Sequence, residues 1–209
     1  MQRLSNIQLL LGDIYFWKCD QCMLITLARI VWGITGSGDL VHEIIKTMEQ
    51  MEDDPHIRLT VIVSRAGEQM LRLYGLWDEL NATFSKVKKE SNSNVPFIAG
   101  PLQVGKYDAI IVAPLTANST AKIAHGIADT LITNAIAQTL KGSTPVFLYP
   151  VDQVDEEVKT VGPKGEEFSI KPRRIDLENV RLLREMERVT VVDSPLVIPK
   201  IIADLLKKE

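Results

Sequence analysis

The 209-residue sequence has few of the side chains that bind metals or form disulfides: two cysteines and three histidines. Cys19 and Cys22 form a CxxC pair, the spacing of redox dithiols and of half a zinc or iron–sulfur site. A complete site needs about two more ligands, but no second cysteine pair exists and His42, His56 and His125 form no ligand motif. We therefore expect no metal site and assign no chemistry to the CxxC pair.

The chain also lacks long apolar runs and an excess of basic charge. No run reaches the roughly 18 apolar residues that a membrane-spanning helix needs, and Asp13 and Lys18 interrupt the apolar stretch at the N-terminus, which argues against a signal peptide. The net charge of −3 does not provide the basic face that nucleic-acid binding requires. We predict a cytoplasmic protein that binds neither membranes nor nucleic acid.

What the sequence does contain is a regular alternation of apolar strands and amphipathic helices. Strands are predicted at 28–34, 57–63, 95–99, 109–113, 144–150 and 189–192. Helices are predicted at 38–51, 66–74, 176–187 and 195–207, with two short ones meeting near 126–129. Near-continuous apolar strands, each followed by a helix, indicate a parallel sheet covered on both faces. We predict an α/β fold: a single doubly wound, Rossmann- or flavodoxin-like three-layer sandwich. The charged, alternating segment 151–174 predicts a β-hairpin excursion.

Three strand-to-helix corners carry similar residues: "TGSG" (35–38), "SRAG" (64–67) and "PLTANS" (114–119). Ligands of such sheets bind at the carboxyl ends of the strands, where the strand order reverses. Hydroxyls and free N–H groups at a helix start suit a phosphate, although the same residues are ordinary helix caps and turn formers. No GxGxxG or GxxxxGK[ST] motif is present. Three such corners in one sheet favour an anionic ligand.

The candidate binding residues come from these corners, and no catalytic or metal-ligating residue is assigned. They are Thr35, Gly36, Ser37, Gly38, Ser64, Arg65, Pro114, Leu115, Thr116, Ala117, Asn118 and Ser119.

Two stretches, "ITGSG" (34–38) and "PLTANSTAKIAHGIADTLITNA" (114–135), resemble the motifs of a known flavoprotein family. This family contains the flavin-dependent cysteine decarboxylases and the prenyl-transferring flavin proteins. The resemblance spans roughly residues 28–150. The archaeoflavoprotein branch, whose members are archaeal electron-transfer proteins with FMN, also resembles residues 170–205. The resemblance implies FMN as the cofactor and a homo-oligomer, a trimer or a multiple of one.

The resemblance also implies roles for individual residues. The corner at 114–119 would surround FMN, with Thr116, Ala117 and Asn118 reaching it, and Pro114 would end the strand. Ser37 and Ser64 would serve the phosphate and ribityl chain. Arg65 either adds charge there or is a solvated surface residue, and Asp129 is expected to cap the second helix.

Two departures from the family pattern argue against decarboxylation. Gly100 stands where the decarboxylases carry a catalytic histidine, and "YPVDQV" (149–154) replaces their Pro-Ala-Met-Asn motif. Three functions remain. The first is electron transfer, with ferredoxin or a similar iron–sulfur protein as the donor. The others are reduction of an organic substrate such as dihydromethanopterin, and non-catalytic flavin binding.

Two further expectations concern a partner and the domain limits. Lys171, Arg173 and Arg174 are the candidate contacts for an acidic ferredoxin. Residues 1–22 are expected to be dispensable, either an artefact of a non-native start or a poorly packed extension, ahead of a flavoprotein domain at 23–209.

Overall fold

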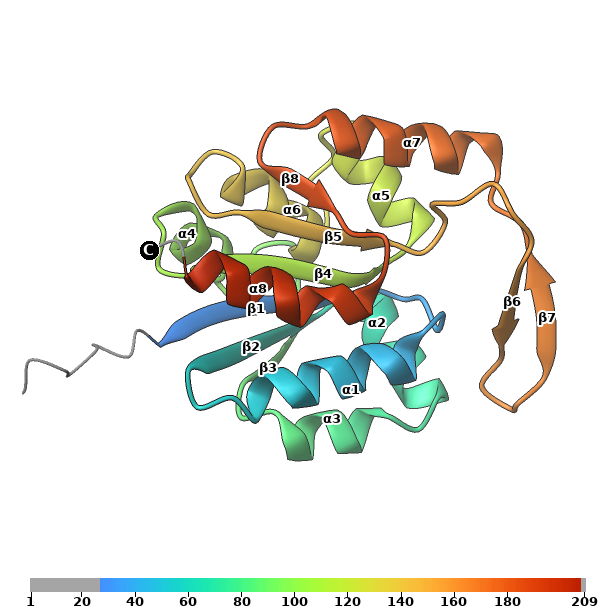
Figure 1. Cartoon of the computed structure of the whole chain (residues 1–209), viewed down its shortest axis with the longest axis horizontal. Coiled ribbons are helices and arrows are strands. Elements are labelled where there is room, and N and C mark those ends of the chain that lie inside the picture. Colours follow the sequence, from blue (N-terminus) through green and yellow to red (C-terminus); the bar gives the residue numbers. More distant parts are fainter. Residues whose placement is uncertain (1–26, 208–209) are drawn as a thin grey trace, which may run out of the picture.

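A computed structural model of the chain describes residues 27–207 and shows a central sheet with helices on both faces (Figure 1). Cys19, Cys22 and the predicted extension 1–22 lie outside the described residues. Within 27–207, no helix is both long enough and apolar enough to cross a bilayer.

The interior strands of the sheet are apolar almost throughout, because helices cover both of their sides. The order of the sheet is β3-β2-β1-β4-β5-β8, with every neighbouring pair parallel. The interior strands are β1 (Ala28–Ile34), β2 (Ile57–Val63), β4 (Ala109–Leu115) and β5 (Val146–Pro150). The edges are β3 (Val87–Lys89) and β8 (Val189–Val191). The predicted doubly wound α/β fold is confirmed.

Successive side chains of each strand enter different cores, as the two-residue period requires. In β1, Trp32 and Ile34 pack in one core while Val31 packs in the other. The first core is closed by α1 (Val41–Glu52), α2 (Arg65–Leu73), α3 (Trp77–Thr83) and α8 (Ile198–Leu206), the last preceded by the 3₁₀ turn η1 (Pro195–Val197). The second is closed by α4 (Ala99–Gln103), α5 (Ala117–Ala124), α6 (Leu131–Thr139) and α7 (Arg174–Glu185).

Two local predictions were wrong, and two helices were missed. Residues 95–99 form no strand, since Val95 makes only an isolated bridge to Asn92 before α4 begins, and the third strand is instead β3. Helices α3 and α4 were not predicted. Pro114 does not end its strand, because β4 continues to Leu115, which pairs with Pro150 after a register shift.

The predicted excursion is a two-stranded antiparallel hairpin, β6 (Val158–Val161) and β7 (Glu167–Ile170). It projects away from the body at the right of Figure 1. One contact with the body is a hydrogen bond of 3.1 Å from the Tyr74 hydroxyl to the carbonyl of Val161. The hairpin is therefore an appendage of the fold rather than part of either core.

Candidate functional site

A cleft of about 430 Å³ lies at the carboxyl ends of the strands. The strand order runs outward in opposite directions from β1 and β4, so the cleft stands at the topological switch point of the sheet. Seven of the candidate residues line it: Thr35, Gly36, Ser64, Arg65, Thr116, Asn118 and Ser119. The lining also includes seven residues outside the set of candidates: Ala66, Glu90, Asn92, Ser93, Asp129, Thr130 and Ile132.

Thr35, at the end of β1, joins the two strands that flank the switch point. Its buried hydroxyl donates to the carbonyl of Pro114 at 2.7 Å and accepts from the N–H of Thr116 at 2.9 Å. Its own N–H also donates to Pro114, at 3.2 Å. Both roles of the hydroxyl are thus used within the chain, and Thr35 shapes the cleft by holding the ends of β1 and β4 together.

The corner after β4 leaves helix α5 with open donors. Thr116 is the N-cap, and its hydroxyl accepts from the N–H of Ser119 at 3.3 Å while its carbonyl accepts from Thr120 at 2.8 Å. The N–H groups of Ala117 and Asn118 have no acceptor within residues 27–207. Unpaired N–H groups at a helix start bind carbonyl or anionic oxygens well. This corner can therefore hold a polar ligand through the main chain.

The corner after β2 has the same cap but a different first turn. Ser64 caps α2 by accepting from the N–H of Gly67 at 3.0 Å. The N–H of Arg65 donates to the carboxylate of Glu90 at 3.0 Å, and the Arg65 guanidinium contacts the carbonyl of Ser91. The N–H of Ala66 has no acceptor in the described chain.

Glu90 is one of the lining residues that sequence reasoning missed. It follows β3, and its second carboxylate oxygen accepts from the N–H of Leu131, the first residue of α6, at 2.8 Å. The half-buried carboxylate thus connects the starts of two helices. No local pattern marks this, because its partners are 25 and 41 residues away.

Close packing explains one glycine of the first corner. A Cβ added at Gly36 would lie 2.7 Å from the Cβ of Ala66, which is closer than atoms can approach without a shift. Glycine therefore allows the loop after β1 to pack against the start of α2.

The remaining candidates lie beside the cleft rather than in its lining. The Ser37 hydroxyl accepts from the N–H of Asp39 at 3.2 Å, and Gly38 packs against the Tyr74 hydroxyl. Pro114 and Leu115 belong to β4, and Ala117 is the first residue of α5.

The expected cap by Asp129 was wrong. Thr130 caps α6 in a capping box with Thr133, while the Asp129 carboxylate pairs with the Lys122 ammonium at 2.8 Å.

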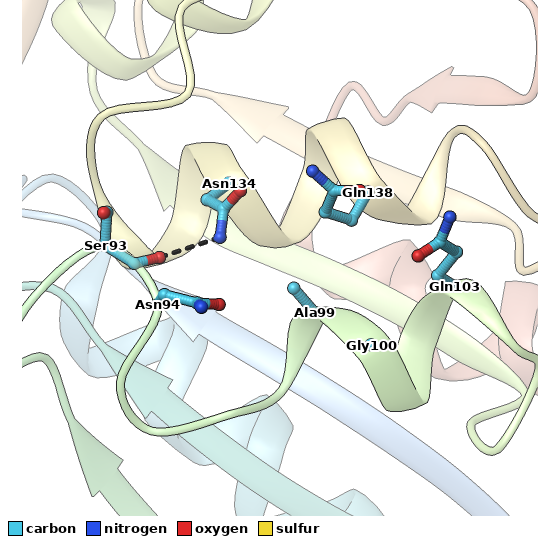
Figure 2. A pocket seen from close by; sticks show the side chains of 7 residues that line it. All are labelled: Ser93, Asn94, Ala99, Gly100, Gln103, Asn134 and Gln138. Atoms are coloured by element: carbon cyan, nitrogen blue, oxygen red, sulfur yellow. Dashed lines mark hydrogen bonds between the residues drawn. The ribbon is translucent and has the colours of Figure 1, made fainter.

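A second, more open cleft of about 420 Å³ adjoins the first through Ser93, a lining residue of both. Figure 2 shows its lining of amide and small side chains, with Asn134 donating to the carbonyl of Ser93 at 2.9 Å. Gly100 is part of this wall, and a Cβ placed there would have no atom within 4 Å. The backbone at position 100 would therefore accommodate a Cβ atom without a clash.

Three acidic groups near the ends of β1 and β5 have raised pKa values, chiefly because burial disfavours their charged forms. Burial raises the pKa of Tyr149 to about 12, with Asp39 and Glu43 adding to the effect. Burial also raises the pKa of Asp39 and that of Asp152. None of the three lines the main cleft. Within 27–207, no three His, Cys, Asp or Glu side chains are grouped so as to hold a metal ion.

The basic residues after the hairpin do not form an uncompensated positive patch. Lys171 pairs with Asp155 at 3.2 Å, Arg173 with Asp176 at 2.7 Å, and Arg174 with Glu178 at 2.9 Å. Because each cation has a carboxylate partner, this surface offers less attraction to an acidic protein than the sequence suggested.

The chain matches the protein family described as Flavoprotein over residues 24–207. An uncharacterized protein of Methanocaldococcus jannaschii is 42% identical, with 84% of this chain and 95% of that protein covered. A dihydromethanopterin reductase (acceptor) of the same organism is 32% identical, with 80% and 92% covered.

Solved structures show the same arrangement. The FMN complex of DmrB from Burkholderia xenovorans, described as a cubic protein cage for redox transfer, superposes with a TM-score of 0.74. It is 34% identical, with 87% of this chain and 97% of that chain covered. A dodecameric FMN-dependent UbiX-like decarboxylase from Escherichia coli O157:H7 shares only the fold, at 16% identity and a TM-score of 0.59, with 86% and 92% covered.

Proposed function

The chain belongs to the Flavoprotein family, and from this premise we propose that its main cleft binds FMN and that the protein is an FMN-dependent oxidoreductase. The observation that carries the proposal is the set of open main-chain donors, on Ala66, Ala117 and Asn118, around a cleft at the switch point of the sheet. FMN, when bound, accepts and donates electrons singly or in pairs.

The residues of the chain supply binding and orientation. The N–H groups of Ala117 and Asn118, with the exposed Asn118 side chain, suit the carbonyl and ring-nitrogen acceptors of a flavin. Ser64, Ser37 and the N–H of Ala66 suit its phosphate and ribityl hydroxyls. Thr35 holds the strand ends between these two groups of donors.

For the substrate we favour a reduced pterin of the dihydromethanopterin type, as in the name of the relative that is 32% identical. A ferredoxin-like electron donor is the second candidate, but the pairing of Lys171, Arg173 and Arg174 with carboxylates weakens the attraction of its expected docking patch. We also propose a cytoplasmic homo-oligomer, in keeping with the cubic cage and the dodecamer described for two similar structures.

The test is a purification followed by anaerobic mixing. The protein should purify yellow with one noncovalent FMN per chain, and the photoreduced protein should recover its oxidised spectrum when mixed with 7,8-dihydropterin. A colourless protein that does not take up added FMN would refute the proposal. Reduction by reduced ferredoxin, with no reaction toward dihydropterin, would replace the pterin assignment with electron transfer.

A further inference from the structure

Glu90 holds a negative charge in a fixed position in the wall of the main cleft. Its two carboxylate oxygens accept from Arg65 at 3.0 Å and Leu131 at 2.8 Å, the first residues of α2 and α6. Its own N–H donates to the carbonyl of Val63 at 2.9 Å, which fixes its backbone to the end of β2. Side chain and main chain are therefore both held in place.

This position places the carboxylate against two positive helix ends. A helix N-terminus carries about half a positive charge, so one carboxylate between two such ends cancels most of their combined potential. The other charged groups at the lining are the Arg65 guanidinium, which keeps its charge while it contacts the carbonyl of Ser91, and Asp129, which pairs with Lys122. Glu90 is the carboxylate bonded to the starts of α2 and α6, and it offsets the positive potential that these two helices present to the cleft.

We propose, resting on the FMN function proposed above, that Glu90 is a positioning residue that lowers the reduction potential of the bound flavin by neutralising the starts of α2 and α6. Two-electron reduction of a flavin with uptake of one proton adds one negative charge to the ring system. Exposed helix N-termini would stabilise that charge, and Glu90 removes this stabilisation. Because the carboxylate is half-buried, solvent screens it less than it would screen a surface charge.

The direct test replaces Glu90 and measures the midpoint potential of bound FMN by anaerobic redox titration. Glu90→Gln should raise the affinity for reduced FMN relative to oxidised FMN about tenfold, which corresponds to about 30 mV for a two-electron couple. Glu90→Asp, which keeps the charge, should stay close to the wild type. The matched control is Asp129→Asn, which removes the same charge from the same lining at a side chain that is 54% exposed and paired with Lys122. The midpoint potential of FMN in Asp129→Asn should shift clearly less than in Glu90→Gln.

A second pair of variants leaves Glu90 intact. Arg65→Pro and Arg65→Ala both remove the guanidinium, but only proline removes the N–H that donates to Glu90. Proline suits the first position of a helix, and the extended backbone of Ser64 is compatible with a following proline. In Arg65→Pro the Glu90 carboxylate has lost one N–H donor, so less of its negative charge is offset. The reduction potential of bound FMN should therefore be lower in Arg65→Pro than in Arg65→Ala.

The outcomes separate this inference from the function on which it rests. Equal potentials for Glu90→Gln and Asp129→Asn, with FMN bound at full stoichiometry, would overturn the role of Glu90 and leave FMN binding intact. If Glu90→Gln fails to fold or to retain FMN, the Arg65 pair decides, and equal potentials in that pair overturn the role. A wild-type protein without FMN would instead overturn the proposed function.

Discussion

Helices α2 and α5 begin in the same way, yet they present different chemistry to the cleft. Each is capped by a hydroxyl side chain, Ser64 or Thr116, that accepts from the N–H three residues later. In α2 the first N–H is taken by the Glu90 carboxylate, whereas in α5 the first two N–H groups have no acceptor among the described residues. A capping motif therefore identifies a helix start, but a distant residue decides whether that start can bind a ligand.

The largest effect should come from Thr35, which holds the α5 corner against β1. Thr35→Val removes both hydrogen bonds of the hydroxyl and leaves the N–H of Thr116 without its partner. We expect the free energy of unfolding of the flavin-free protein to fall by about 3 kcal/mol, since leaving buried polar groups unpaired costs about 1–3 kcal/mol each. Urea denaturation of the flavin-free protein measures this free energy of unfolding.

The matched control is Thr139→Val, at another buried threonine. Its hydroxyl donates only to the carbonyl of Ala135, one turn earlier in the same helix. Loss of this bond should cost about 1 kcal/mol or less. Equal losses for the two variants would show that Thr35 does not connect the corners.

A smaller effect should follow from closing the open α5 corner. Ala117→Pro removes one of the two free N–H groups at a position where helices accept proline, after a residue with extended backbone. We expect the dissociation constant for FMN to rise about fivefold, because the loss of one hydrogen bond costs about 1 kcal/mol. Fluorescence titration of the apoprotein with FMN measures the dissociation constant. Ala117→Gly, which keeps the N–H, should bind more tightly than the proline variant, and equal affinities would contradict a role for this donor.

The smallest effect concerns the third corner, where α1 begins after Asp39. Burial raises the pKa of Asp39, opposed by the Thr160 hydroxyl and reinforced by Glu43. The folded state thus holds this proton more tightly than the unfolded state, so Asp39 costs stability as the pH rises through its raised pKa. Asp39→Asn should be more stable than the wild type at neutral pH, and the gain should vanish on acidification.

Asp176 is the control with the opposite sign. The Arg173 guanidinium lowers the pKa of Asp176, so its contribution to stability is present above the unfolded pKa and is lost as the pH falls. Asp176→Asn should therefore be less stable than the wild type at neutral pH, with the difference shrinking in acid. Thermal unfolding across this pH range checks both variants, and parallel profiles would contradict the assignment.

The interior strands of the sheet could be predicted from the sequence because a strand that is buried on both faces is a nearly continuous run of apolar residues. The strands at 28–34 and 57–63 were predicted with the bounds that the structure has. The edge strand β3 has no such apolar run, since two of its three residues are lysines. Lysine is common on sheet edges, where it discourages pairing with other chains. The apolar run at 95–99 therefore looked more like a strand than the real one did.

The residues of the cleft also differ in whether the sequence alone could indicate them. Ser64 and Thr116 were predicted because hydroxyl residues at a strand-to-helix corner form a local pattern in the sequence, and in the structure each caps the helix that follows. Glu90 was not, because it acts on two helices brought beside it only by the order of the strands. Residues that act within one turn could be read from the sequence, whereas those that act between elements required the fold.

The hydrogen bonds of Thr35 have a consequence for the kinetics and entropy of ligand capture. Its hydroxyl and its N–H bond to Pro114 and Thr116, and these bonds hold the ends of β1 and β4 together. A ligand that enters between them need not order the two corners, and the entropy of ordering such segments is a main cost of association. Encounter should then proceed with little conformational delay, and differences in affinity among variants of the cleft should appear mainly in the dissociation rate.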